Sequence, residues 1–541
     1  MRNEGKLGLI ALSAMALGWS ETASAYIGDS FLSIPDQKGH WQGTEHKDWI
    51  RAEASEWQGR LTKLNSGATD PLAGNKLFFG GPNVPKPGNG GGKIALSFSK
   101  TNADLPALMA LCAKKTPIAQ LTYAESSDRA RPVLELGARP AEFPAFWEYR
   151  LKDVVVDDCP VLKGAADQII MISFRDIQWL NYDPARPNAN PIPVAPEKIR
   201  AVRPAAPKPG QKARAYLITW IAPATLPPQA EACPVLETKP SEADVYRYLT
   251  EGEVAVLKKR WSMKGVSYGP DSERRGPHRM SVASFPGSVP DPVMPEPKAT
   301  IADGLDLDGE QSGTRTPNGI RKHANFTAPD GRKGIDNQLL RVYGCVPGLR
   351  GKQGYGNQTP NARRADGNVV TLIEVSGIDD DKNDGEVEVA LIYSGDRPVR
   401  DSLGKTFIPN YTFSPSRDPN FAIYNARVKG RIVDGVVMSD PIPLLKMNPG
   451  QGPEASLHQA RFRIAPQADG SAKVLLGGYQ EWKKLAVSSG YSEGLFNYKI
   501  PGLYYGFRRH ADGLYDPVSG EYNGISMAYE IDTVPAFLVD E

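Results

Sequence analysis

The sequence contains few cysteines, no excess of charge of one sign and no long apolar run after its first 25 residues. None of its four cysteines occurs in the CxxC spacing of zinc and redox sites. The 64 lysines and arginines nearly balance the 62 aspartates and glutamates, so the charge gives no reason to expect a nucleic acid partner or an anionic membrane surface. No later stretch approaches the roughly eighteen apolar residues of a membrane-spanning helix. We therefore predict no membrane span.

Several short motifs of common enzymes are also missing. The chain has no HExxH pair, no CxxCH haem site and no Walker loop, and its six histidines stand apart in sequence. The sequence therefore identifies no catalytic residue, and it leaves open whether the protein is an enzyme.

The first 25 residues have the features of a Sec signal peptide. Arg2 and Lys6 form a basic start, Leu7 to Trp19 form a short apolar run, and Ala23-Ser24-Ala25 is a small-residue cleavage site. We predict that the mature chain begins at Tyr26 and is periplasmic or extracellular.

The abundance of turn-forming residues favours a β-rich, multi-domain protein. The chain holds 53 glycines and 47 prolines, which suit many short strands and long loops better than helical bundles. The predicted organisation is a barrel domain at 26–193, a Pro-rich linker at 194–212, a mixed strand and helix connector at 213–300, and a second β domain at 301–541.

The first domain shows strand patterns on both sides of one short helix. Leu105, Leu108, Met109 and Cys112 follow a helical period and predict a buried face at about 104–113. The segments with strand patterns are 31–34, 49–57, 94–99, 121–123, 147–156 and 169–179.

Several segments of this domain carry a family resemblance. FLSIPDQKGH, HKDWIRAEASEW, ALSFSKTNADLPALMALC and WEYRLKDVVV together resemble the Hcp family, the tube protein of type VI secretion. The resemblance implies a small β-barrel with one helix, in a family that stacks as rings. It suggests an assembly or docking module, with a protein partner or self-association through the barrel.

The even, sparse cysteines predict two disulfide bonds in an oxidising compartment. Cys112 faces the core from the predicted helix and Cys159 ends a strand of the same barrel, so we expect these two to pair. Cys233 and Cys345 would form the second bond.

Short strands dominate the C-terminal block and are followed by a helical pattern at 480–510. About eight to ten strands with long loops predict a jelly-roll-like β-sandwich with peripheral helices. A longer region, which runs from CPVLETKPSEADVY through GLDLDG, EVSGIDDDKNDGEVEV and LHQARFRI to GGYQEW, resembles an uncharacterised extracytoplasmic bacterial region. The resemblance implies an exported β-rich protein and no particular catalytic residue.

Two acidic, glycine-containing loops in this block could bind Ca²⁺, a cation that prefers oxygen ligands. The candidate ligands are Asp306, Asp308, Asp330 and Asp336 in the first loop, and Asp379, Asp381 and Asn383 in the second. Neither loop matches an EF-hand fully, and Asx-turns use the same residues without metal. In the first loop, nearby basic residues could neutralise the aspartates instead: Arg321, Lys322, Arg332 and Lys333.

Two functions fit these observations. The first is an exported, non-enzymatic binding or structural protein with an Hcp-like assembly or docking module. The second is a secreted hydrolase acting on polysaccharide or envelope material, for which Glu374 and Glu386 are candidate carboxylates. A carbohydrate partner is compatible with either function.

Overall fold

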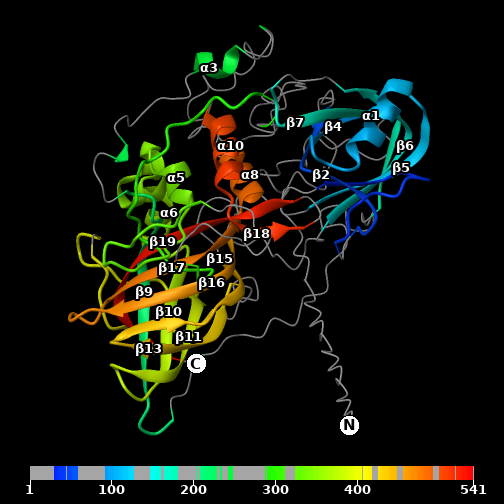
Figure 1. Cartoon of the computed structure of the whole chain (residues 1–541). Coiled ribbons are helices and arrows are strands. Elements are labelled where there is room, and N and C mark those ends of the chain that lie inside the picture. Colours follow the sequence, from blue (N-terminus) through cyan, green and yellow to red (C-terminus); the bar gives the residue numbers. More distant parts are fainter. Residues whose placement is uncertain are drawn as a thin grey trace, which may run out of the picture.

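The computed structural model shows two β-rich units, with helices between them and over one end of the larger unit (Figure 1). No described helix is long and apolar enough to span a bilayer. The predicted signal peptide and most of the predicted linker lie outside the described residues. The structure describes residues 30–43, 46–58, 92–126, 146–159, 164–180, 204, 208–227, 232–233, 242–247, 251, 287, 289–310, 323–404, 406–416, 424–447, 455–491, 499–517 and 520–539.

The N-terminal unit is a β-barrel that closes through one interrupted strand. Its strands pair in the order β2-β1-β5-β6-β7-β4-β3, and β8 pairs with β6. The ends of this order, β2 and β3, are separated only by Glu53, whose N–H donates to the carbonyl of Ser97 at 2.8 Å. The sheet therefore returns on itself. The strands are β1 (Ser30–Ser33), β2 (Ile50–Ala52), β3 (Ala54–Gln58), β4 (Gly92–Ser99), β5 (Ile118–Ser126), β6 (Phe146–Asp158), β7 (Asp167–Phe174) and β8 (Asp176–Trp179).

Strand β7 is buried on both faces, as its nearly continuous apolar sequence DQIIMISF indicates. Ile170 and Ile172 point into the barrel core. Ile169 and Met171 pack with Ala95 of β4 in a separate cluster. Because side chains alternate along a strand, this second cluster marks the outer face of β4 and β7. The outer face of β4 and β7 is therefore shielded from solvent.

The predicted helix is present as α1 (Leu105–Lys114), with Leu108 fully buried in the barrel core. It ends at Lys115, which adopts the left-handed conformation (φ 47°) common at helix C-termini. Cys112 of α1 is bonded to Cys159 after β6, with Cα atoms 6.4 Å apart. The predicted first disulfide is confirmed.

The second unit is a single eleven-stranded sheet whose pairings also run in a ring. The order is β12-β19-β17-β16-β14-β13-β11-β10-β9, and β19 additionally pairs with β9. β15 pairs with β16 and β18 pairs with β19 at the side of this ring. The strands are β9 (Lys212–Pro223), β10 (Val370–Ile378), β11 (Asp384–Ser394), β12 (Tyr411–Phe413), β13 (Ala426–Val433), β14 (Val436–Ser439), β15 (Ile442–Met447), β16 (Ala455–Pro466), β17 (Ala472–Glu481), β18 (Gly513–Asp516) and β19 (Glu521–Leu538).

Helices cover one end of this sheet, and two of them lie toward the N-terminal barrel (Figure 1). Trp482, Leu503 and Phe507 of these two helices are buried in the core of the second unit. Cys233 and Cys345 are bonded, with Cα atoms 5.6 Å apart, so the second predicted disulfide is confirmed. The described helical segments are α3 (Glu242–Tyr246), α5 (Leu339–Tyr343), η6 (Pro347–Leu349), η7 (Gly351–Gln353), α6 (Tyr355–Ala365), α8 (Trp482–Tyr491) and α10 (Ile500–His510).

The predicted fold class, mainly β with an N-terminal barrel, is confirmed, and the second unit differs in detail from the expected two-sheet sandwich. Its core lies inside one curved sheet, because β19 reaches across to β9. The sequence placed β9 in a connector and did not predict β19. Both disulfides fit an extracellular or periplasmic location.

Candidate metal centre and docking interface

The first acidic loop is built from two segments, 301–310 and 323–337, that lie against each other. Bridges join Leu305 to Asp336 and Phe326 to Ile335. Gly304 permits this approach, because a Cβ atom there would lie 2.7 Å from the side chain of Ile335. The loop is thus anchored by backbone pairing.

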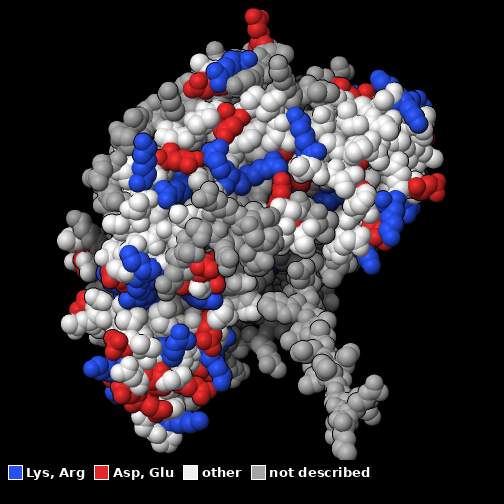
Figure 2. All heavy atoms as spheres, in the orientation of Figure 1, with Lys and Arg blue, Asp and Glu red and all other residues white. Residues whose placement is uncertain are grey.

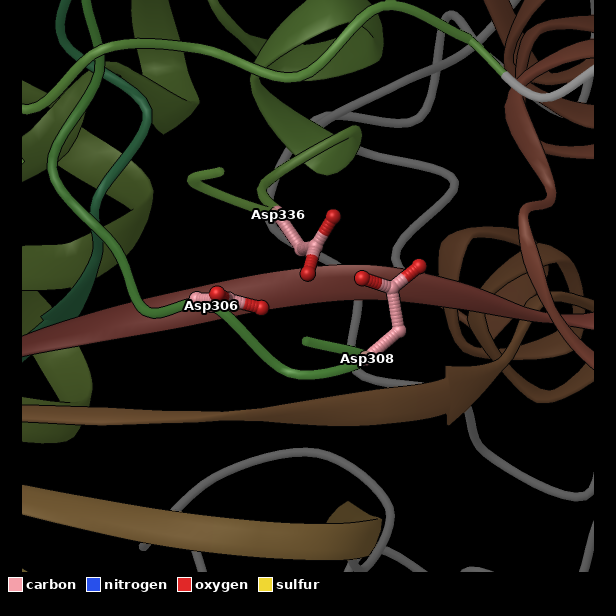
Figure 3. Close-up of side chains that lie close together, drawn as sticks. All are labelled: Asp306, Asp308 and Asp336. Carbon is pink, nitrogen blue, oxygen red and sulfur yellow. The ribbon is translucent and has the colours of Figure 1, made fainter. Parts of the chain in front are cut away.

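Three carboxylates converge where these segments meet. One carboxylate oxygen from each of Asp306, Asp308 and Asp336 lies within 4.8 Å of the others. Figure 3 shows the three side chains directed toward one another above two strands of the sheet. Asp336 is buried, Asp306 is half-buried and Asp308 is exposed, so the cluster opens to solvent on one side.

Each carboxylate is oriented by a backbone N–H group. Asp336 accepts from Leu307 at 2.7 Å, Asp306 from Gly309 at 2.7 Å, and Asp308 from Glu310 at 2.8 Å. The bonds of Asp306 and Asp308 are the local Asx-type bonds expected of turn chemistry, whereas the bond of Asp336 joins the two segments of the loop. They also hold the cluster in place without a cation.

The electrostatics of the cluster disfavour three negative charges without compensation. Burial raises the pKa of Asp336 to about 8, and the charges of Asp308, Asp512 and Asp306 add to this rise, while the Leu307 N–H opposes it. Asp512 is thus a fourth carboxylate close enough to act on Asp336. No sequence pattern pointed to it, because it lies far along the chain, in the turn after α10.

The donor set suits a hard divalent cation, because carboxylate oxygens are the ligands that Ca²⁺ prefers. Two of the basic residues that could have neutralised the aspartates have other partners: Arg332 pairs with Asp330 at 2.8 Å, and Lys333 donates to Thr327 at 3.3 Å. The other two, Arg321 and Lys322, lie outside the described residues.

Asp330 lies outside the converging group. Its carboxylate pairs with Arg332 and, at 3.4 Å, with Arg463 of β16. Burial alone would raise the pKa of Asp330, but hydrogen bonding and charge from Arg332 hold it below its usual value. The structure therefore places Asp330 in an ion pair on the rim of the loop.

The second acidic loop directs its candidate ligands to separate partners. Asp381 pairs with Lys212 at 2.7 Å and with Arg214 at 2.9 Å. Asp379 accepts a hydrogen bond from Gln211 at 3.2 Å, and the Asn383 side-chain oxygen accepts one from the Asp434 N–H at 3.1 Å. In the part of the chain that the structure describes, this loop contributes no group of three possible metal ligands.

The two carboxylates considered for hydrolysis are both engaged across strands. Glu374 is 3% exposed and pairs with Arg427 at 2.5 Å, and Glu386 pairs with Lys429 at 2.7 Å. These pairings are those of sheet-stabilising cross-strand ion pairs.

A second feature is a polar interface between the barrel and α10. Asp167 of β7 is 3% exposed and accepts hydrogen bonds from Tyr504 at 2.7 Å and from Ser97 at 3.1 Å. Arg508 lies 3.6 Å from Asp167, and it pairs with Glu521 at 2.7 Å. Tyr504 and Arg508 thus reach the covered outer wall of β4 and β7.

The interface extends to the point where the barrel closes. Lys483 of α8 forms an ion pair with Glu53, and the two side chains are 16% and 15% exposed. Burial would raise the pKa of Glu53, but Lys483 and Arg51 hold it below its usual value. A compensated charge pair therefore links the two units.

Acidic and basic side chains lie beside one another over both units on the face in Figure 2. Acidic groups gather at the end of the sheet where β11 and β13 lie, and basic groups border them. This pattern agrees with the nearly balanced total charge.

Among solved structures, Hcp proteins are similar to part of this chain. No family model and no curated protein matches the chain. Hcp2 from Salmonella typhimurium is 15% identical, with a TM-score of 0.18, over 28% of this chain and 84% of its own. Hcp1 from the same organism is 19% identical, with a TM-score of 0.17, over 27% of this chain and 81% of its own. A type VI secretion system effector from Yersinia pestis is 12% identical, with a TM-score of 0.15, over 28% of this chain and 83% of its own. Similarity to Hcp proteins is therefore found for less than a third of the chain.

Proposed function

We propose that this chain is an exported, non-enzymatic binding or structural protein whose N-terminal barrel is an assembly or docking module. The observation that carries the proposal is the polar interface on the outer wall of β4 and β7, where Asp167 meets Tyr504 and Arg508. A barrel wall that recognises a helical surface through buried polar groups is a docking surface. In this chain, that surface is engaged by the chain's own α8 and α10.

The composition of the interface favours a reversible contact. The basic side chains of its charged pairs keep some exposure to solvent: Lys483, which pairs with Glu53, is 16% exposed, and Arg508, which pairs with Asp167, is 23% exposed. Interfaces between units of one chain resemble transient protein–protein interfaces when they are this polar. Release of the barrel would leave the wall of β4 and β7 available to a partner or to a second copy of this chain.

The test is to weaken the interface from the helix side. Arg508→Ala combined with Lys483→Ala removes both cationic partners, and we expect the barrel to separate, seen as a larger radius of gyration in small-angle X-ray scattering. Arg509→Ala is the matched control, because Arg509 pairs with Asp291 and Glu296 outside the barrel.

An unchanged scattering profile in the double variant would count against the docking role. Turnover of polysaccharide or peptidoglycan by the purified protein would overturn the non-enzymatic assignment. The two outcomes are independent, because the first concerns the interface and the second concerns chemistry.

We also propose that Asp306, Asp308 and Asp336 hold Ca²⁺, which would stabilise the loop against the sheet. Support comes from the convergence of three carboxylates within 4.8 Å around the buried Asp336. At a free Ca²⁺ concentration 100 times the dissociation constant, a bound ion adds about 2.7 kcal/mol to the free energy of unfolding. Ca²⁺ would also need further oxygens from backbone carbonyls or water, since it takes six to eight ligands.

The cation test compares thermal melting in Ca²⁺ with melting in chelator at pH 8, where a larger fraction of Asp336 is ionised than at neutral pH. We expect a higher melting temperature in Ca²⁺ for the wild type and no such difference for Asp336→Asn. Asp330→Asn is the matched control from the same loop and should keep the response. Equal melting of the wild type in both buffers would leave only turn chemistry.

A further inference from the structure

A buried arginine at the end of α6 has no anionic partner among the described residues. Arg364 lies in the last turn of this helix and is 4% exposed. Its Nη1 donates two long hydrogen bonds, to the Thr371 hydroxyl at 3.3 Å and to the Val369 carbonyl at 3.5 Å. Its Nε–H has no acceptor in the part of the chain that the structure describes. The Nε–Nη2 edge of the guanidinium is therefore unused.

The nearest acid along the chain does not neutralise this charge. Asp366 is 60% exposed and pairs with Arg400 at 3.1 Å. Among the described residues, no carboxylate pairs with Arg364. Burial lowers the pKa of Arg364, but a guanidinium keeps its proton in proteins, so Arg364 cannot relieve the cost of burial by losing its charge.

The helix C-terminus does not account for the arginine either. The last carbonyls of α6 are already capped by backbone N–H groups: Asp366 donates to Ala362 at 2.9 Å, Gly367 to Arg364 at 3.0 Å, and Asn368 to Arg363 at 3.0 Å. The charge of Arg364 would complement the helix dipole, an effect of modest size. That effect needs no burial and leaves Nε–H unsatisfied.

Two other partly buried arginines in this protein are each neutralised by two carboxylates. Arg427 is 20% exposed and has both Glu374 and Glu388. Arg508 is 23% exposed and has both Asp167 and Glu521. Arg364 is more buried than either and has no carboxylate partner among the described residues, which is the arrangement expected where a bound anion completes the charge balance.

Two hydroxyl-bearing residues of the sheet lie near Arg364. Thr371 is 3% exposed and is paired across the sheet with Tyr393, which is 2% exposed and close enough to Arg364 to interact electrostatically. The ring of Tyr393 packs against Tyr424, with centroids 5.3 Å apart. Hydroxyls beside a guanidinium are suitable donors to oxygen atoms.

We propose that Arg364 anchors a binding site for a small oxyanion, a carboxylate or phosphate group, on its Nε–Nη2 edge. The planar guanidinium fork matches two oxygens of such a group in a bidentate contact, and Thr371 and Tyr393 lie beside it. The site belongs to the second unit and is separate from both the acidic cluster and the barrel interface.

The experiment is thermal melting of the full chain in increasing acetate, succinate or phosphate, with ionic strength held constant by chloride. We expect a saturable rise in melting temperature of several degrees with at least one of the three. The three titrations distinguish the ligand class. A response to acetate or succinate indicates a carboxylate ligand, and a response to phosphate alone indicates a phosphorylated ligand.

Arg364→Lys keeps the charge and loses the fork, so it should raise the half-saturating concentration by about tenfold. Arg363→Lys, at the next position of the same helix, is the matched control and should respond as the wild type does. If Arg364→Lys does not fold, Thr371→Val is the second variant and should weaken the response several-fold. A wild type that responds to none of the three, or an Arg364→Lys variant that responds equally well, would overturn the proposal.

Discussion

The two acidic loops of the second unit have similar sequences and opposite electrostatics. In the first loop, three carboxylates face one another and burial raises the pKa of Asp336 to about 8. In the second loop, the hydrogen bond and charge of Lys212, with the charge of Arg214, hold the pKa of Asp381 below its usual value. Local composition is shared, so the difference comes from what the rest of the fold places beside each loop.

The difference has a consequence for pH dependence. Carboxylates with raised pKa values favour the folded state when protonated, so the stability they contribute is present at low pH and is lost as the pH rises through their folded pKa. Carboxylates with lowered pKa values behave in the opposite way. The two loops should therefore respond to pH in opposite directions.

The largest effect is expected for a compensated acid just outside the second loop, Glu374 of β10, whose cation is Arg427. Arg427→Met leaves Glu374 buried without its cation, and we expect a loss of about 3 to 5 kcal/mol, the usual cost of removing one partner of a buried pair. Urea unfolding measures this loss. The double variant Arg427→Met with Glu374→Gln should regain most of the stability, and equal stability of the single variant and the wild type would contradict the prediction.

A second variant tests a carboxylate whose pKa is raised, as the pKa of Asp336 is in the first loop. Burial, then the charge of Asp303, raise the pKa of Glu530 to about 7, against about 4.3 in an unfolded chain. The stability contributed by Glu530 is therefore complete below about pH 4 and is lost as the pH rises through about 7.

We expect Glu530→Gln to match the wild type at pH 4 and to be more stable at pH 8, by up to about 3 kcal/mol. Thermal unfolding across this pH range measures the difference. A difference that shrinks as the pH rises would have the wrong sign and would contradict the assignment.

Hydrogen exchange can distinguish the loops directly. Because the N–H groups of Leu307 and Gly309 are bonded to the clustered carboxylates, Ca²⁺ should slow their exchange by up to about 100-fold at saturating concentration. The amides of Asp379 and Lys382, which are bonded to acids in the second loop, should not change. Equal slowing in both loops would indicate general stabilisation without a local site.

The smallest expected effect is at Asp381, which is 40% exposed and pairs with Lys212 and Arg214. Asp381→Asn should cost less than about 1 kcal/mol, because exposed ion pairs contribute little and are screened by salt. The lowered pKa of Asp381 means that this difference disappears as the pH falls through that pKa. A larger cost, unaffected by salt, would show that the pair is less solvated than its exposure indicates.

Much of the first unit followed from local patterns. The period of Leu105, Leu108 and Cys112 predicted α1, and the apolar alternation predicted the strands of the barrel, because these signals act over a few residues. The cysteines could be paired from the expected helix and strand. By contrast, Asp512 could not be associated with Asp336 from the sequence, because no short-range pattern connects α10 with the first acidic loop.

The sequence by itself determined the β-rich class, the helix of the barrel, the cysteine pairs and the turns that orient individual aspartates. Only the tertiary structure decided which acids meet each other and which meet cations, because those partners are brought together by strand pairing across hundreds of residues. The pairing of β19 with β9 is the clearest case, since it joins residues 529–536 to residues 215–223 and turns the expected sandwich into one continuous sheet. Side-chain alternation specifies a strand but not its neighbour, and the neighbour is selected by burial of the whole core.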